Sequence, residues 1–295
     1  MGNTQSMIFT LFGDYIRHYG NKIWIGSLIR LLKEFGHNEQ SVRVAASRMV
    51  KQGWLQSQKN GNKSYYFLTK RGEKRMDEAG RRIFKLSPHK WDGKWRILMY
   101  TIPEKRRRIR EDFRKELMWS GFGHLSNSCC ISPNNLEKEV GFILEKYEIT
   151  PYVDFFVTDH VGPKDNHSIV ERSFQMKEIE KKYKEFIANY EKQFEFHEKL
   201  MKEGKMTDAD CFVERTKLVH EYRKFLFIDP GLPKELLPDI WCGQEAAQLF
   251  RQYYQLLAVP ASRFFESVFE TEHHVLHRND QYDATVHPYI VHENN

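Results

Sequence analysis

The sequence has no run of apolar residues near the ~20 that a membrane-spanning helix needs. Its N-terminus, MGNTQSMIFTLFGDY, has no basic segment ahead of the apolar part and no small-residue cleavage site. We therefore expect neither a membrane partner nor a secretory signal. Only 4 of the 295 residues are cysteine, and they form no CxxC pair. A disulfide framework and a thiolate zinc site thus have little support, and the reducing cytoplasm is the expected compartment.

Motifs of several enzyme classes are also missing. The chain contains no Walker loop, no GxGxxG and no GxSxG. Its one metal-like cluster is EHHVLH at residues 272–277, where His273 and His277 would share a helix face. We interpret that cluster as a polar helix end near the tail. The sequence therefore predicts no enzyme: it offers no catalytic residue, no metal and no cofactor.

Positive charge is concentrated toward the N-terminal end. Residues 1–85 hold 16 Lys and Arg against 6 Asp and Glu, and residues 86–128 hold 10 against 5. Residues 129–295 hold 20 against 29. This asymmetry is typical of a polyanion-binding part joined to a more acidic remainder. A solvated basic surface would give the same totals, so the order of the elements has to decide.

The first 86 residues predict a winged helix–turn–helix. Asn38 and Thr69 are good N-caps, and the Asn-Gly of KNGNK at 59–63 is a strong hairpin signal. The apolar spacing predicts helices over about 8–16, 24–35, 38–52 and 70–85, with strands at 54–56 and 65–68. Helix, turn, helix and then a basic hairpin is the order of that DNA-binding domain.

The third helix presents a cationic outward face. Val42, Ala45, Ala46, Met49 and Val50 share its inward face, and we expect no acidic side chain on the other. The outward residue types suit base edges and phosphates in a major groove, and the Lys residues of the hairpin suit the backbone. The candidate DNA-binding residues are Ser41, Arg43, Val44, Ser47, Arg48, Lys51, Lys59, Asn60 and Lys63. A winged helix that binds protein, as an adaptor, is the alternative.

Residues 87–170 predict a ferredoxin-like β-α-β-β-α-β domain. The stretch resembles the small metal-dependent endonuclease of CRISPR spacer acquisition, in which an Asp follows an aromatic residue on the first strand. Here Thr101 follows Tyr100, and a hydroxyl is a poor ligand for a hard cation. We therefore predict that the domain has the fold of this endonuclease but not its metal-dependent activity. A metal-dependent nuclease that uses Asp92 or Asp154 is the competing hypothesis, and the run at 105–110 either touches DNA or is solvated.

Residues 171–295 predict a mainly helical domain. A near-heptad stripe runs from Met176 to Phe194 and fits either a dimer seam or intramolecular core. A second helix is expected over about 208–226 and a third over about 246–256. Because proline disrupts a helix interior, we expect a separate fourth helix after Pro260, over 261–269.

Several stretches together resemble the phenylacetate-catabolism repressors, the PaaX family, over nearly the whole chain. They are TLFGDYIRHYG, VRVAASRMVKQGWL, GNKSYYFLTKRG, WRILMYTIPEKRRRIREDFRKELMWSGFG, FIDPGLPKELLP and PASRFFE. The resemblance implies a multidomain α+β protein with domains at 1–86, 87–170 and 171–295. It also implies a bacterial transcriptional repressor that binds double-stranded DNA as a homodimer, on a near-palindromic operator, and is released by phenylacetyl-coenzyme A.

The effector is implied by the resemblance alone, but chemistry constrains its site. Coenzyme A carries phosphates and the phenylacetyl group is flat and apolar, so the pocket needs cations beside aromatic walls. The candidate effector-binding residues with that environment in the C-terminal segment are Arg223, Arg251, Tyr254 and Arg263. Ordinary cation–π packing is the alternative for each of them.

Overall fold

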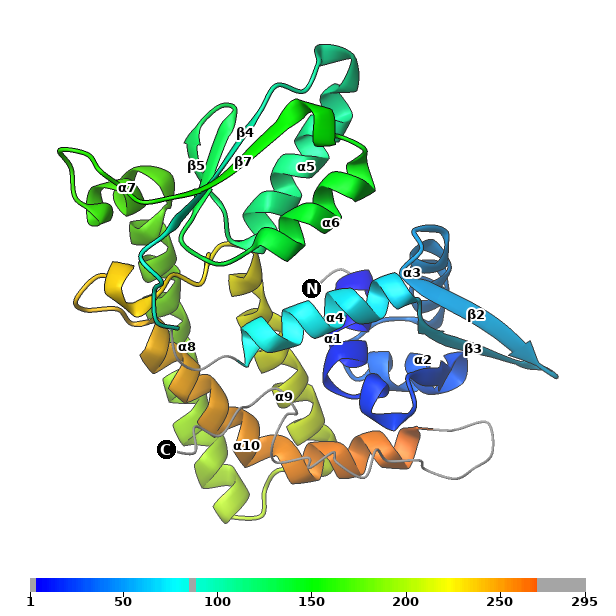
Figure 1. Ribbon diagram of the computed structural model, residues 1–295. Helices are drawn as coiled ribbons and strands as arrows, with labels where there is room; N and C mark the ends of the chain where they lie inside the picture. The colour runs from blue at the N-terminus through cyan, green and yellow to red at the C-terminus, as the bar shows by residue number, and fades with distance from the viewer. Residues whose placement is uncertain (1–3, 85–88, 270–295) are drawn as a thin grey trace. The chain divides into compact units, whose positions relative to one another are not determined.

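The computed structural model describes residues 4–84 and 89–269 (Figure 1). Packing divides this part of the chain into two compact units. The first holds residues 4–84, 187–223 and 247–269, and the second holds residues 89–186 and 224–246. Packing thus groups the winged helix with much of the C-terminal segment, whereas the sequence suggested three consecutive domains. The multidomain α+β class is confirmed.

The predicted winged helix–turn–helix is present, with an additional short strand ahead of its second helix. Its elements are α1 (Thr4–Asp14), β1 (Lys22–Trp24), α2 (Ile25–Lys33), α3 (Glu39–Lys51), β2 (Leu55–Asn60), β3 (Lys63–Leu68) and α4 (Lys70–Ile83). Asn38 Oδ1 accepts a hydrogen bond from the Ser41 N–H at 2.8 Å, and Thr69 Oγ1 accepts one from the Gly72 N–H at 3.1 Å. These caps fix the starts of α3 and α4 by satisfying backbone donors that a helix start leaves open.

The start of the second helix was predicted one residue too early. Trp24 lies in β1, where it pairs with Tyr65 of β3 in a sheet of order β1-β3-β2. The helical spacing of Trp24 with its neighbours is real, but pairing with β3 decides its backbone conformation. That pairing covers one edge of β3, whose other edge is bonded to β2.

Gly61 and Asn62 close the β2–β3 hairpin, which confirms the predicted wing. Asn60 pairs with Lys63 across the turn. Gly61 has φ +55°, whereas Asn62 is not among the positive-φ residues. A positive φ at the first central position alone is typical of a type II′ turn, where glycine is preferred. Asn60 therefore ends the strand instead of occupying the turn.

The C-terminal helices contribute an aromatic core to the first unit. They are α8 (Met176–Lys202), α9 (Asp208–Tyr222) and α10 (Gly243–Val268). Tyr15, which directly follows α1, stacks on Phe265 of α10 at 5.0 Å between ring centroids, and Tyr222 stacks on Phe250 at 4.1 Å. Phe194 of the α8 stripe meets Tyr253 at 5.6 Å. Met176, Ile179, Tyr183 and Phe186 of the same stripe are buried within the second unit, so within this chain the stripe packs as core.

The separate helix expected after Pro260 does not exist, because α10 runs unbroken through that residue. An interior proline removes one hydrogen bond and destabilises a helix by about 3 kcal/mol. Leu257, Ala258, Ala261 and Phe265, on both sides of the proline, are fully buried. Burial of one Leu or Phe side chain contributes ~1.5–3 kcal/mol, so packing of a continuous helix outweighs the local penalty.

The second unit contains the predicted ferredoxin-like domain. Its elements are β4 (Trp95–Tyr100), a 3₁₀ turn (Glu104–Arg106), α5 (Arg107–Ser120), β5 (Gly123–Ser126), β6 (Cys129–Ser132), α6 (Glu137–Tyr147), β7 (Val153–Thr158) and α7 (Asn166–Ser173). The sheet is antiparallel with order β5-β6-β4-β7, and α5 and α6 lie together on one side of it (Figure 1). Leu98, Phe113, Leu117, Cys130 and Val140 form the core between these helices and the sheet.

Two expectations concern the chain as a whole. Within the described ranges no helix is long and apolar enough to span a membrane. The His273 and His277 cluster lies outside the described residues.

Candidate nucleic-acid interface

The outward face of α3 is exposed over its length. Val42, Ala45, Ala46 and Met49 are buried beneath it. Ser47, Arg48 and Lys51 are exposed, as are Arg43 and Val44, while Ser41 is half-buried. The structure thus brings the predicted residues of α3 together on one cationic face, because the 3.6-residue period places them there.

One acidic side chain also lies on this face, so the expectation of a face without acids is wrong. Glu39 Oε1 accepts a hydrogen bond from Arg43 Nε at 2.8 Å, and Arg43 Nη2 forms an ion pair with the same oxygen at 2.8 Å. The two side chains are 61% and 53% exposed. A solvent-exposed pair of this kind contributes only ~0.2–1 kcal/mol, so a phosphate can compete with Glu39 for Arg43. The i,i+4 spacing of the two residues predicts the pair, and our sequence analysis overlooked it.

The wing carries its cations on the strands beside the turn. Lys59 and Asn60 at the end of β2 are exposed, and Lys63 is half-buried with its Nζ 4.8 Å from the centroid of a Trp24 ring. Lys22 of β1 donates to Gln58 Oε1 at 3.0 Å, which adds a cation to the sheet. Sequence analysis missed Lys22 because β1 is a three-residue strand with no local pattern of its own.

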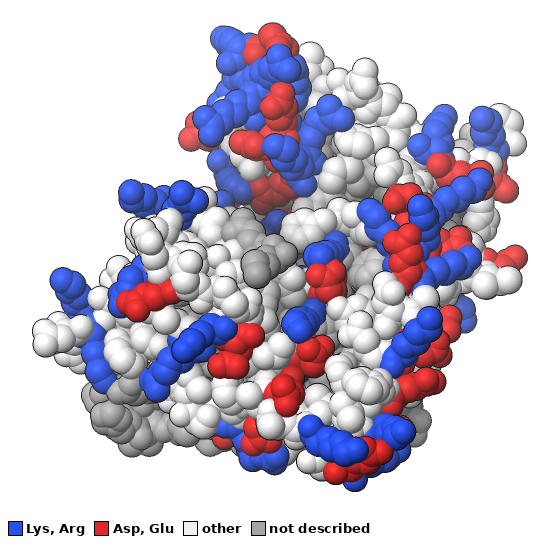
Figure 2. All heavy atoms as spheres, turned by 180° about the vertical axis from the view of Figure 1, so that it is seen from behind, with Lys and Arg blue, Asp and Glu red and all other residues white. Residues whose placement is uncertain are grey.

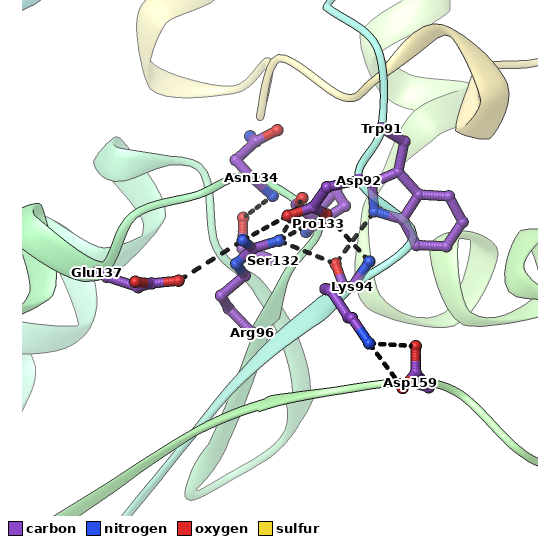
Figure 3. Close-up of polar contacts among 9 residues, drawn as sticks. All are labelled: Trp91, Asp92, Lys94, Arg96, Ser132, Pro133, Asn134, Glu137 and Asp159. Carbon is purple, nitrogen blue, oxygen red and sulfur yellow. Dashed lines mark hydrogen bonds and ion pairs between the residues drawn. The ribbon is translucent and has the colours of Figure 1, made fainter.

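The carboxylates considered for a nuclease are not arranged for metal binding. Figure 3 shows Asp92 held by the buried Arg96, which donates to Asp92 Oδ1 at 2.8 Å and to Oδ2 at 2.6 Å. These hydrogen bonds lower the pKa of Asp92 to about 2. Asp154 is an exposed residue of β7 opposite Met99. Within the described residues, no group of three or more His, Cys, Asp and Glu side chains could hold a metal.

The candidate effector residues have different surroundings. Arg223 donates to the Ser6 carbonyl at 3.0 Å, and burial lowers its pKa to about 10. Tyr254 is buried and donates to Asp14 at 2.7 Å, whereas the exposed Arg263 donates to both oxygens of Asp208 at 2.9 and 2.7 Å. Arg251 is half-buried. Ligand binding by these four residues stays a prediction.

A winged helix with a cationic, exposed third helix, joined to a ferredoxin-like domain, defines a DNA-binding regulator. Family comparisons match residues 3–72 to "PaaX-like protein", 88–170 to "PaaX protein central Cas2-like domain" and 174–267 to "PaaX-like protein C-terminal domain". The chain is 32% identical to the transcriptional repressor PaaX of Escherichia coli strain K12 over 271 residues, which cover 90% of this chain and 84% of that protein. The chain belongs to the PaaX family and is a regulator, not an enzyme.

One solved structure is similar over much of the chain. It is an uncharacterised protein, Rv0674, from Mycobacterium tuberculosis. The TM-score is 0.48 at 23% sequence identity, covering 82% of this chain and 89% of the other.

Proposed function

We propose that the protein is a cytoplasmic, dimeric repressor of phenylacetate-degradation genes, which binds a near-palindromic operator and is released by phenylacetyl-coenzyme A. The observation that carries its DNA-binding half is the face of α3, where Arg43, Arg48 and Lys51 are exposed above a buried layer of Val42, Ala45, Ala46 and Met49. Membership of the PaaX family supports repression.

In this proposal α3 enters the major groove. Arg48 and Arg43 have the donor geometry for guanine edges, and Lys59 in the wing neutralises a phosphate. A two-fold symmetric dimer places its two recognition helices on half-sites separated by whole turns of DNA, about 10 bp or a multiple.

The test of the recognition helix is the affinity of Arg43→Ala and Arg48→Ala for operator and random duplex across a range of salt concentrations. If the side chain binds a base, its removal should reduce operator affinity by ~1–3 kcal/mol and relax specificity. If it binds a phosphate, its removal should weaken both duplexes and lower the salt slope by about 1. Arg172→Ala removes an exposed Arg of the other unit and is the control. If both α3 variants match this control, α3 is not the recognition helix.

The effector is tested separately. Phenylacetyl-coenzyme A should bind preferentially to the form of the dimer whose two recognition helices do not fit both half-sites, and so shift the population away from DNA. Operator binding is titrated with phenylacetyl-coenzyme A, phenylacetate and free coenzyme A. Release by the thioester alone supports the proposal, and indifference to all three removes the inducer but leaves the DNA-binding function.

A further inference from the structure

A second cationic surface lies in the ferredoxin-like domain, which belongs to the second unit. We call it the α5 basic tip: Lys105, Arg106, Arg107 and Arg108, where the 3₁₀ turn passes into α5. Residues 104–115 hold seven Lys and Arg against three Asp and Glu. Figure 2, which views the molecule from behind, shows Lys and Arg side chains gathered over the start of α5, with fewer acids among them.

The fold uses only one of the four cations of the tip for packing. Arg106 donates to the Glu148 carbonyl at 2.9 Å, and its guanidinium lies 5.8 Å from the centroid of the Tyr152 ring. Its contacts hold the turn against the segment that leads into β7. Arg107 pairs with Glu111 at 3.0 Å while remaining 68% exposed. A pair this exposed adds little stability and leaves Arg107 open to another anion.

Lys105 and Arg108 are exposed, and neither forms an ion pair among the described residues. Their position is unfavourable for folding alone. The first turn of α5 contains no acidic residue and no side chain caps it, so its backbone N–H groups add positive potential at the same end. Like charges on consecutive residues also repel one another, so stability of the fold does not explain why four cations are placed together here. An external anion would relieve both effects.

We propose that the α5 basic tip is a second DNA-contacting surface, which binds the phosphate backbone of duplex DNA without reading its sequence. The proposal rests on the proposed function, since the α3 face already directs the chain to DNA. Lys and Arg side chains that neutralise phosphates release condensed counterions, and this term is independent of base sequence. The tip therefore adds affinity and salt dependence, while specificity stays with α3.

The test is the triple variant Lys105→Gln/Arg107→Gln/Arg108→Gln, which leaves the anchoring Arg106 in place. Affinity for operator and for random duplex is measured from about 50 to about 300 mM salt. Each phosphate contact contributes roughly 0.9 to the magnitude of the slope of log affinity against log salt concentration. We expect the slope to fall by about 2 to 3 and affinity at about 100 mM salt to fall at least about tenfold for both duplexes. The ratio of operator to random affinity should not change.

The matched control is Lys138→Gln/Lys177→Gln/Lys181→Gln, which removes three exposed cations of the same unit and changes the net charge equally. The charge-keeping variant Lys105→Arg/Arg107→Lys/Arg108→Lys should bind like the wild type. If the tip triple behaves as the control triple, or if the charge-keeping variant loses as much affinity as the Gln triple, the proposal fails.

Two further outcomes separate this proposal from its neighbours. The first outcome is that the wild type binds vesicles rich in anionic lipid, that the Gln triple variant does not, and that the salt slope of DNA binding is the same for both. This outcome would assign the tip to a membrane surface and overturn the DNA proposal. A wild type that binds random duplex as tightly as the operator would overturn the proposed function. In that case, the salt slope of random-duplex binding, compared between wild type and the Gln triple variant, would still test the tip. The two failures are therefore distinguishable.

Discussion

Arg215 donates a hydrogen bond to Asp14 at 3.1 Å, and the two side chains are 0% and 1% exposed. The residues are 201 positions apart in the sequence. The Tyr254 hydroxyl donates to the same Asp14 oxygen at 2.7 Å, and the Arg215 guanidinium lies 4.1 Å from the centroid of the Tyr254 ring. A buried charge network therefore joins α1 of the winged helix to α9 and α10.

Replacing one partner of this pair should strongly destabilise the first unit. Asp14→Asn leaves the Arg215 charge buried without its counter-charge, and losses of this kind are about 3–5 kcal/mol. Urea unfolding measures the change. The exposed pair between Asp208 and Arg263 is the matched comparison, and Asp208→Asn should reduce stability by about 1 kcal/mol or less. Equal effects of the two variants would show that the buried network does not hold α1.

The free energy of unfolding should fall as the pH is lowered, in part because of His18. Burial, followed by the charges of Arg17 and Arg215, lowers its pKa to about 3 from 6.5. In the unfolded chain His18 therefore binds a proton below pH 6.5, whereas in the folded chain it binds one only below about pH 3. The contribution is complete above pH 6.5 and is lost as the pH falls toward 3, with a slope of at most ~1.4 kcal/mol per pH unit for one proton.

His18→Gln tests this contribution by its effect on the slope. Burial also lowers the pKa values of His37, His124 and His197, so a slope should remain, but a shallower one. Urea unfolding of wild type and variant at pH 7, 6 and 5 gives the comparison, whatever the variant does to stability at pH 7. Parallel curves would contradict the assignment to His18.

Glu39→Gln should tighten DNA binding. Glu39 holds Arg43 in an exposed ion pair and repels phosphate from the same face. Its neutralisation frees the guanidinium and removes a like charge from the interface, so we expect roughly threefold or greater gain in affinity at low salt, shrinking as salt screens the charges. Glu198→Gln, which breaks the corresponding i,i+4 pair with Lys202 in α8, is the control and should have no effect. Weaker binding by Glu39→Gln would mean that Glu39 orients Arg43 productively.

Asp92→Asn should destabilise the ferredoxin-like domain without changing operator specificity. The carboxylate forms a two-point hydrogen bond with Arg96, which is 3% exposed, and removal of a hydrogen bond to a charged group costs ~1.5–3 kcal/mol. Lys94→Gln, which breaks the exposed Lys94–Asp159 pair, should have a much smaller effect. Thermal unfolding and operator affinity are the two measurements. A specificity change in Asp92→Asn would instead place this network next to DNA.

Local sequence patterns were sufficient for most of the candidate interface. The cationic face of α3 follows from the 3.6-residue period, and its start from the Asn38 cap. The wing follows from the turn-forming residues of KNGNK between two strands, although Gly61 and Asn62 occupy the turn and Asn60 ends the strand. The ferredoxin-like order follows from alternating strands and helices. Each of these features depends on residues a few positions apart, so a short stretch of sequence is enough to predict it. The Glu39–Arg43 pair is equally local and could have been predicted.

The features that only the tertiary structure decided depend on residues far apart in the chain. Trp24 becomes strand because β3 pairs with it, and α10 continues through Pro260 because buried neighbours on both sides outweigh the missing hydrogen bond. The Asp14–Arg215 network joins segments that the sequence assigned to different domains. Local periodicity fixes which face of an element is apolar, but the partner of that face depends on packing free energies summed over the whole chain, which no short stretch of residues specifies.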